Sequence, residues 1–462
     1  MPTREQLIDR ARSARAAGRH AEAAAAWRDA IDLCPDEAVL YHNWAAALGD
    51  LRRHAEAAAA LEAGFTKGLN AYQSYLVLAR AKAGLLRHEE ATRAYRRYLD
   101  SAPADVTAQI EHAQLLWMQT ADAGHALETL DAAIRRLPAP VDLVIARCRL
   151  VGEMGDRDAA YAGLRAAMAR YGPTAEALGA ASAAALACGN AAAAVDHAVQ
   201  LVAIHPSDAA ALVAHAMALI AVGSYASAQE TIDRLRTVNP LNQYHVALQG
   251  DLWRLTGSER QRDLYDYDRL IFRAPLEAPP GWPSAEAYVD DLVEALQTRH
   301  EYQAEPFFQS VRHGSQISSL ASFDDPALQG FSAAVTPGAR RFAEHLSSMS
   351  GPAGARSSGK ANLVGAWSVQ LPAGGFHADH IHPEGWISSA CHLLCSNPGE
   401  GERSGWLKFG QSALPTSPQL TAEYFVEPSP GVVVFFPSYF WHGTVPTNGG
   451  SRLTVAADFV PT

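Results

Sequence analysis

The pattern of apolar and polar residues divides the chain into two halves. Residues 1–240 are rich in Ala and Leu, and regular Gly and Pro residues punctuate them. This pattern predicts helices separated by turns. From Asn362 onwards the chain consists of short runs of strand-forming residues, such as NLVGAWSVQL and GVVVFFP, separated by Gly, Pro, Ser and Asn. Many short strands between turn signals predict an all-β barrel or sandwich.

A 34-residue period runs through the helical half. The segment Arg19–Ala23 (RHAEA) recurs at Arg53–Ala57 and, as RHEEA, at Arg87–Ala91. Glycines fall where the turn between two paired helices is expected, at Gly18, Gly84, Gly189 and Gly223. Prolines end each second predicted helix, because Pro cannot continue one; they are Pro35, Pro103, Pro138, Pro173, Pro206 and Pro240. This period is typical of tetratricopeptide repeats, and residues 1–240 resemble that family over about seven units.

The resemblance implies a stacked array with a concave groove, a surface that commonly holds a peptide. We therefore expect recognition of a peptide or protein, with a spacer or a dimerisation surface as the alternative. The repeat histidines His20, His54 and His88 are expected to be structural or solvated.

The connection between the two halves is expected at residues 241–283. It begins with capping helices and ends in APLEAPPGWPS, a Pro- and Gly-rich linker candidate. Residues 284–462 then form the third predicted part. Ser284–His300 has the apolar spacing of an amphipathic helix, and a further helix is expected at about residues 338–349.

Composition excludes several function classes. The formal charge of −11 argues against nucleic acid as the main partner, because phosphate binding needs a basic surface. No apolar run approaches the roughly 20 residues that span a bilayer, and the first 20 residues lack the apolar core of a secretory signal. The odd count of five cysteines, three of them scattered, favours a reducing cytoplasm over a disulfide framework.

Candidate chemistry is concentrated in the stretch GGFHADHIHPEGW. His380 and His382 are spaced i, i+2, and so are His377 and Asp379, so either pair would share one face of a strand. His442 follows 60 residues after His382 and precedes Arg452 by ten. This is the layout of a mononuclear non-haem iron site that also binds a 2-oxo acid. The residues alone leave both pairs open, and a hydrogen-bonded polar patch is the alternative to a metal site.

The strand segments GGFHADHIHPEGWISS, GWLKF, GVVVFFPSYFWHGTVP and SRLTVAADF resemble successive motifs of one bacterial family. Its members join tetratricopeptide repeats to a 2-oxoglutarate/Fe(II)-dependent oxygenase domain. The resemblance implies a multidomain α + β protein, with an N-terminal α-solenoid and a C-terminal double-stranded β-helix, or jelly roll. It also implies two cofactors, Fe(II) and 2-oxoglutarate.

The same resemblance favours one assignment of the site. The bacterial family places its metal motif at His380 and His382, which with His442 gives an all-imidazole triad. The wider superfamily usually shows His-x-Asp/Glu, which would instead choose His377 and Asp379. Arg452 is the expected anchor of the distal carboxylate of 2-oxoglutarate, because a guanidinium binds a carboxylate through two parallel hydrogen bonds. Thr454 shares its strand face and would add a third. His392 is expected to pack or to support the ligands.

The function expected from these residues is hydroxylation of an unactivated C–H bond on a peptide or protein that the repeat array presents. Two alternatives stay open. One is an all-histidine metal oxygenase that uses no 2-oxo acid, and the other is a non-catalytic peptide-binding adaptor with a degenerate barrel.

Overall fold

The structure, a computed structural model, describes residues 2–395 and 403–462. It divides into two compact units, Met1–Pro140 with Ser322–Asp324, and Val141–Ala321 with Asp325–Thr462. In the described part of the chain, no helix combines the length and the apolar character that crossing a bilayer requires.

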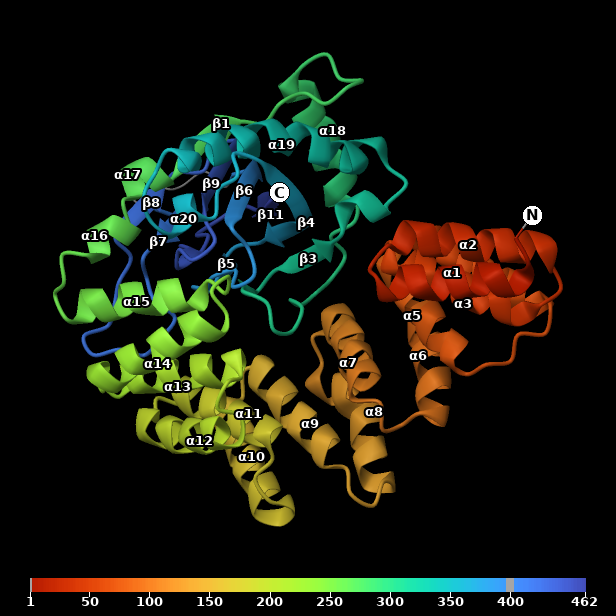
Figure 1. The fold of residues 1–462 in the computed structure, drawn as a ribbon, viewed down its shortest axis with the longest axis horizontal. Helices are drawn as coiled ribbons and strands as arrows, with labels where there is room; N and C mark the ends of the chain where they lie inside the picture. The colour runs from red at the N-terminus through yellow and green to blue at the C-terminus, as the bar shows by residue number, and fades with distance from the viewer. Residues whose placement is uncertain (1, 396–402) are drawn as a thin grey trace. The chain divides into compact units, whose positions relative to one another are not determined.

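The first unit is built from helices that pack in consecutive pairs (Figure 1). Its alanine-rich sequence allows this packing: Ala23, Ala57 and Ala91, which close the three RHAEA-type segments, are completely buried where paired helices approach each other. The helices are α1 (Arg4–Ala16), α2 (His20–Leu33), α3 (Ala38–Asp50), α4 (His54–Thr66), α5 (Gln73–Gly84), α6 (His88–Ser101), α7 (Val106–Thr120) and α8 (Ala123–Arg136).

The second unit begins with the same arrangement. Asp156, Thr174, Asn190 and Asp208 each precede a helix and accept a hydrogen bond from a backbone N–H of its first turn. The helices are α9 (Val141–Glu153), α10 (Arg157–Tyr171), α11 (Ala175–Ala187), α12 (Ala191–Ile204), α13 (Ala209–Ala221), α14 (Tyr225–Val238) and α15 (Tyr244–Leu255). The predicted helical repeat array is confirmed.

The glycines do not all act as predicted. Gly18, Gly189 and Gly223 lie between paired helices with φ of +72°, +74° and +81°, a conformation that favours glycine. Gly84 is instead the last helical residue of α5, and the imidazole of His54 occupies the space where a Cβ would lie. The left-handed turn after α5 is made by Leu86, at φ +58°. Gly84 is therefore required by close packing rather than by a turn.

After α15 the chain forms two antiparallel sheets, as expected of a jelly roll. The larger sheet has the order β1-β9-β6-β11-β4-β3 and the smaller has the order β10-β7-β8, with a separate β2-β5 ribbon. The strands are β1 (Phe272–Pro275), β2 (Val311–Arg312), β3 (Ser315–Ser318), β4 (Ala361–Leu371), β5 (Phe376–His377), β6 (Ile387–Leu394), β7 (Leu407–Phe409), β8 (Tyr424–Val426), β9 (Val432–Pro437), β10 (His442–Thr444) and β11 (Arg452–Pro461). Phe409 of the smaller sheet packs edge-on against Phe436 of the larger one, with ring centroids 5.0 Å apart.

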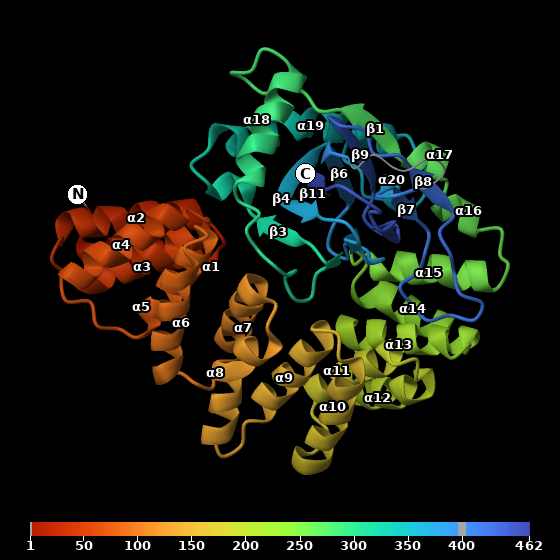
Figure 2. The ribbon, with the colours of Figure 1, turned by 180° about the vertical axis from the view of Figure 1, so that it is seen from behind.

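Two helices, α18 (Ala285–Gln297) and α19 (Pro326–Ser347), cover the outer face of the larger sheet (Figures 1 and 2). The first matches the amphipathic helix expected after the linker, and the second begins about twelve residues earlier than expected. Phe342 of α19 packs against Phe435 and Phe272 of the sheet. The odd-numbered residues of β11 from Leu453 to Phe459 are buried on this side, so its even-numbered residues face the interior between the two sheets.

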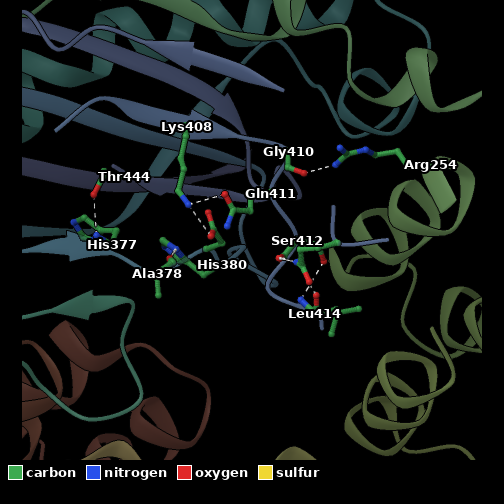
Figure 3. A network of polar contacts seen from close by, with 12 residues as sticks. Arg254, His377, Ala378, His380, Lys408, Gly410, Gln411, Ser412, Leu414 and Thr444 are labelled. Atoms are coloured by element: carbon green, nitrogen blue, oxygen red, sulfur yellow. Dashed lines mark hydrogen bonds and ion pairs between the residues drawn. The ribbon is translucent and has the colours of Figure 1, made fainter. Parts of the chain in front are cut away.

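The last array helix is joined to the barrel by a buried carboxyl group. Asp251 of α15 is completely buried and accepts a hydrogen bond from Ser412 Oγ at 2.6 Å. Arg254, one helical turn on, donates to the carbonyl of Gly410 (Figure 3) and also to the carbonyl of Thr421. Burial raises the pKa of Asp251 to about 7.

Replacement of this carboxyl should change how stability depends on pH. Because its pKa is raised in the folded state, its contribution is fully present below the unfolded pKa of about 4 and is lost as pH rises through about 7. We expect Asp251→Asn to unfold at a higher temperature than wild type at pH 8, with a much smaller difference at pH 4. Thermal unfolding at both pH values measures this, with the exposed Asp290→Asn as control. A difference independent of pH would contradict the assignment.

Candidate metal centre

Three imidazoles from two distant segments meet between the sheets. β5 ends at His377, and His380 then forms an isolated antiparallel bridge with His442 of β10, with both backbone hydrogen bonds at 3.0 Å. His382 lies beyond any strand, and its backbone N–H donates to the carbonyl of Ser438. The expectation that one strand carries both histidines is therefore wrong, although their side chains still meet.

The three rings each offer one nitrogen to a common point. One ligand atom from each of His380, His382 and His442 lies within 4.8 Å of the other two. The Nε2 atoms of His380 and His382 are 3.2 Å apart. Two nitrogens that bind one ion at about 2.1 Å lie roughly 3.0–3.4 Å apart, so this separation suits a shared metal.

The opposite nitrogen of each ring is held by an oxygen acceptor. His380 Nδ1 lies 2.8 Å from the carbonyl of Ala378, and His442 Nδ1 lies 2.9 Å from that of Phe440. His382 Nδ1 lies 2.5 Å from a carboxylate oxygen of Asp458. These acceptors assign the hydrogen to Nδ1 in all three rings and leave the lone pairs on Nε2.

The carboxylate of Asp458, which contacts His382, is itself held by a hydrogen bond. Its other oxygen accepts a hydrogen bond from Ser388 Oγ at 2.8 Å, and Ser388 Oγ lies 2.9 Å from Ser438 Oγ. Ser438 also supplies the carbonyl that binds the backbone of His382. The ring orientation of His382 is thus set by contacts from three separate parts of the barrel.

Burial keeps His380 and His442 neutral. Desolvation lowers the pKa of His380 to about 3, with the neighbouring His382 adding to the effect, and lowers that of His442 well below its usual value. Two lone pairs facing each other at 3.2 Å repel unless a cation lies between them. Three oriented nitrogen donors therefore fit a divalent transition metal such as Fe(II).

The alternative pair is held apart from this centre. Asp379 forms an ion pair with Lys408 Nζ at 2.9 Å and lies against Gly443, on the opposite face of the backbone from the His380 side chain. Lys408 also donates to Gln411 (Figure 3). The ring of His377 is 6.2 Å from that of His380, with its Nδ1 bonded to Ser310 Oγ. The geometry thus brings together the histidine triad and not His377 with Asp379, while metal binding itself stays a prediction.

Arg452 and Thr454 lie on the same interior face of β11 as Asp458. The Arg452 side chain is 1% exposed and donates to the carbonyl of Gly405 at 2.7 Å and to His392 Nδ1 at 3.2 Å. Burial lowers the pKa of its guanidinium to about 10. Among the described residues no carboxylate lies within ion-pair distance of it. A buried cation without a counter-charge suits an anionic ligand.

Sequence reasoning missed two residues beside the triad. Asp458 holds His382, and the indole of Trp367 lies against the same ring at 5.7 Å between centroids. The alternation along β11 was a signal for Asp458, because it lies an even number of residues from Arg452. Trp367 pairs with Ala456 across the sheet, which places it on that face as well.

The carboxylate of Asp458 should contribute to metal affinity, since outer partners of ligating histidines orient the ring and raise its basicity. We expect Asp458→Asn to weaken Fe(II) binding by about tenfold to a hundredfold. Competition with a chelator of known affinity under anaerobic conditions measures this. An unchanged affinity would mean that the contact with His382 has no part in metal binding.

Comparisons with known proteins bear on the same region. Residues 365–458 match a family model described as "Putative 2OG-Fe(II) oxygenase". Among curated proteins no match was found. The expected resemblance to an oxygenase domain is confirmed over these residues.

Among solved structures the chain is similar to a prolyl-4-hydroxylase from Pseudomonas putida, at 14% identity and a TM-score of 0.30, over 43% of this chain and 97% of that one. It is similar to a tetratricopeptide repeat protein from Parabacteroides merdae at 14% identity and a TM-score of 0.40, over 54% and 98%. A viral collagen prolyl hydroxylase from Paramecium bursaria Chlorella virus-1 aligns at 13% identity and a TM-score of 0.28, over 42% and 97%. No functional assignment is drawn from likenesses at these scores.

Proposed function

We propose that this chain, whose residues 365–458 match the oxygenase family, is an Fe(II)- and 2-oxoglutarate-dependent dioxygenase that hydroxylates an unactivated C–H bond. The observation that carries the proposal is the convergence of three imidazoles whose Nδ1 atoms are each held by an acceptor. When bound, Fe(II) and 2-oxoglutarate supply an oxidation in which O₂ converts 2-oxoglutarate to succinate and CO₂ and leaves one oxygen on the substrate carbon.

The chain's own residues have separate roles in this proposal. His380, His382 and His442 would hold the metal through their Nε2 atoms. Asp458 fixes His382. Arg452 and Thr454 bind the distal carboxylate.

The interior face between these two groups carries one row of side chains. Ala456 lies between Thr454 and Asp458 on β11, and its cross-strand partners are Ala390 on β6 and Trp367 on β4. Rows two residues apart on a strand are about 6.6 Å apart. We propose that a short acyl chain crosses this row as it reaches from Arg452 towards the imidazoles.

The expected substrate is a peptide or protein side chain presented by the repeat array. Its support is the array itself, because helical repeats of this kind form extended binding surfaces. We propose repeats over residues 1–240, a capping and linker segment over 241–283 and an oxygenase domain over 284–462. On composition we also propose a cytoplasmic location.

Purified protein incubated with Fe(II), 2-oxoglutarate, ascorbate and O₂ tests the proposal. Succinate should form above the level of a metal-free control. An iron-loaded protein that consumes O₂ with a substrate but forms no succinate would favour the all-histidine oxygenase. A protein that retains no stoichiometric iron would favour the adaptor.

A further inference from the structure

Two buried N–H groups beside the expected cosubstrate pocket have no hydrogen-bond partner among the described residues. One is Nε of Arg452, and the other is Nε2 of His392 on the neighbouring strand β6. Both side chains are at least 99% buried. Buried polar groups are nearly always paired in folded proteins, so two unpaired donors on adjacent side chains indicate a ligand that the described part of the chain does not supply.

The contact between the two side chains fixes which nitrogen of His392 carries the hydrogen. Arg452 donates one N–H to His392 Nδ1 at 3.2 Å. A guanidinium has donors only, so Nδ1 must accept and Nε2 must carry the hydrogen. Burial and the nearby guanidinium lower the pKa of His392 well below its usual value, which keeps the ring neutral.

His392 also lies on the face that the cosubstrate needs. It pairs with Thr454 across the strands, and Thr454 and Arg452 are two residues apart on β11. All three side chains therefore extend from the same interior face of the larger sheet. On that face, the row of Ala390, Ala456 and Trp367 separates them from Asp458 and the histidine triad.

We propose that His392 is a cosubstrate-binding residue whose Nε2–H donates, together with Arg452, to the distal carboxylate of a 2-oxo dicarboxylic acid. This inference rests on the proposed function and adds to it a residue that discriminates between dicarboxylic and monocarboxylic 2-oxo acids. A monocarboxylic 2-oxo acid such as pyruvate has no carboxylate to reach the two donors. His392 also accepts from Arg452, so it orients the guanidinium as well.

Binding of 2-oxoglutarate and of pyruvate to the full-length, Mn(II)-loaded protein under anaerobic conditions tests this, with calorimetry as the readout. His392→Leu and His392→Met lack the donor but fill a similar volume. His392→Gln keeps both an acceptor for Arg452 and an N–H donor. Cys391→Ala serves as the matched control. Cys391 directly precedes His392 on β6 and is buried on the opposite face of the sheet.

We expect both donor-free variants to bind 2-oxoglutarate about tenfold more weakly or worse, because a hydrogen bond to a charged group is lost. Their affinity for pyruvate and their metal content should equal those of wild type, and His392→Gln and Cys391→Ala should bind both acids as wild type does. Because Leu and Met differ in shape, a folding defect in one leaves the other for the measurement.

The possible outcomes distinguish a failure of the role of His392 from a failure of the proposed function. Wild type and the donor-free variants could bind 2-oxoglutarate with the same affinity and the same preference over pyruvate. That result would overturn only the role of His392. If wild type binds neither acid, the proposed function and the role of His392 both fall. Equal losses for both acids in the variants would show a general defect of the pocket and would also overturn the role.

Discussion

His442→Ala protein should purify without stoichiometric iron and form no succinate from 2-oxoglutarate. His442 supplies one of three converging nitrogens, and its backbone forms the bridge that places His380 beside it. Two remaining imidazoles leave a divalent ion with too few protein ligands to be retained through purification. Iron content by plasma emission spectrometry and succinate by mass spectrometry measure the two effects, and we expect both to fall by at least about a hundredfold.

The control for this substitution uses the other candidate pair. Asp379→Asn changes a carboxylate next to His380 in sequence, but its ion pair is with Lys408 on the opposite face of the backbone. It should keep full iron content. His380→Ala should behave like His442→Ala. If Asp379→Asn loses iron while His442→Ala retains it, the triad assignment is wrong.

The helical half could be predicted because each repeat unit is specified by a pattern of neighbouring residues in the sequence. A 34-residue period repeats the same small residues at the same helix contacts, and Ala23, Ala57 and Ala91 are buried at equivalent places. Gly84 shows the limit of that information, since a glycine beside a predicted turn can equally serve close packing. In the structure it makes room for His54, which lies 30 residues earlier.

The residues of the candidate metal centre could be predicted from the sequence, but their arrangement in space could not. The motif spacing identified the residues that meet, but the strand that was to carry them ends at His377. His382 is aimed instead by Asp458, 76 residues later in the chain. Such long-range partners leave no local pattern, and the same holds for Asp251, which joins α15 to the barrel loop at Ser412.

Arg452→Met should strongly weaken 2-oxoglutarate binding while leaving metal binding intact. The guanidinium is the only cation proposed for the distal carboxylate, and loss of one partner of a buried charge pair costs about 2–5 kcal/mol. Since each 1.4 kcal/mol is about tenfold in affinity, we expect the dissociation constant to rise roughly a hundredfold or more. Calorimetric titration of the Mn(II)-loaded variant measures it, and Arg452→Lys, which keeps the charge without the two-pronged geometry, should lie between the variant and wild type.

The same substitution should have the opposite effect on the protein without ligand. A buried guanidinium that lacks a carboxylate partner among the described residues destabilises the fold, and a methionine of similar volume removes that cost. Unliganded Arg452→Met should therefore unfold at or above the temperature of wild type, whereas 2-oxoglutarate should raise the unfolding temperature of wild type alone. A structural arginine would give the reverse: the variant would be less stable without ligand and would still be stabilised by 2-oxoglutarate. The sign of the change in stability thus separates a cosubstrate anchor from a residue that only supports the barrel.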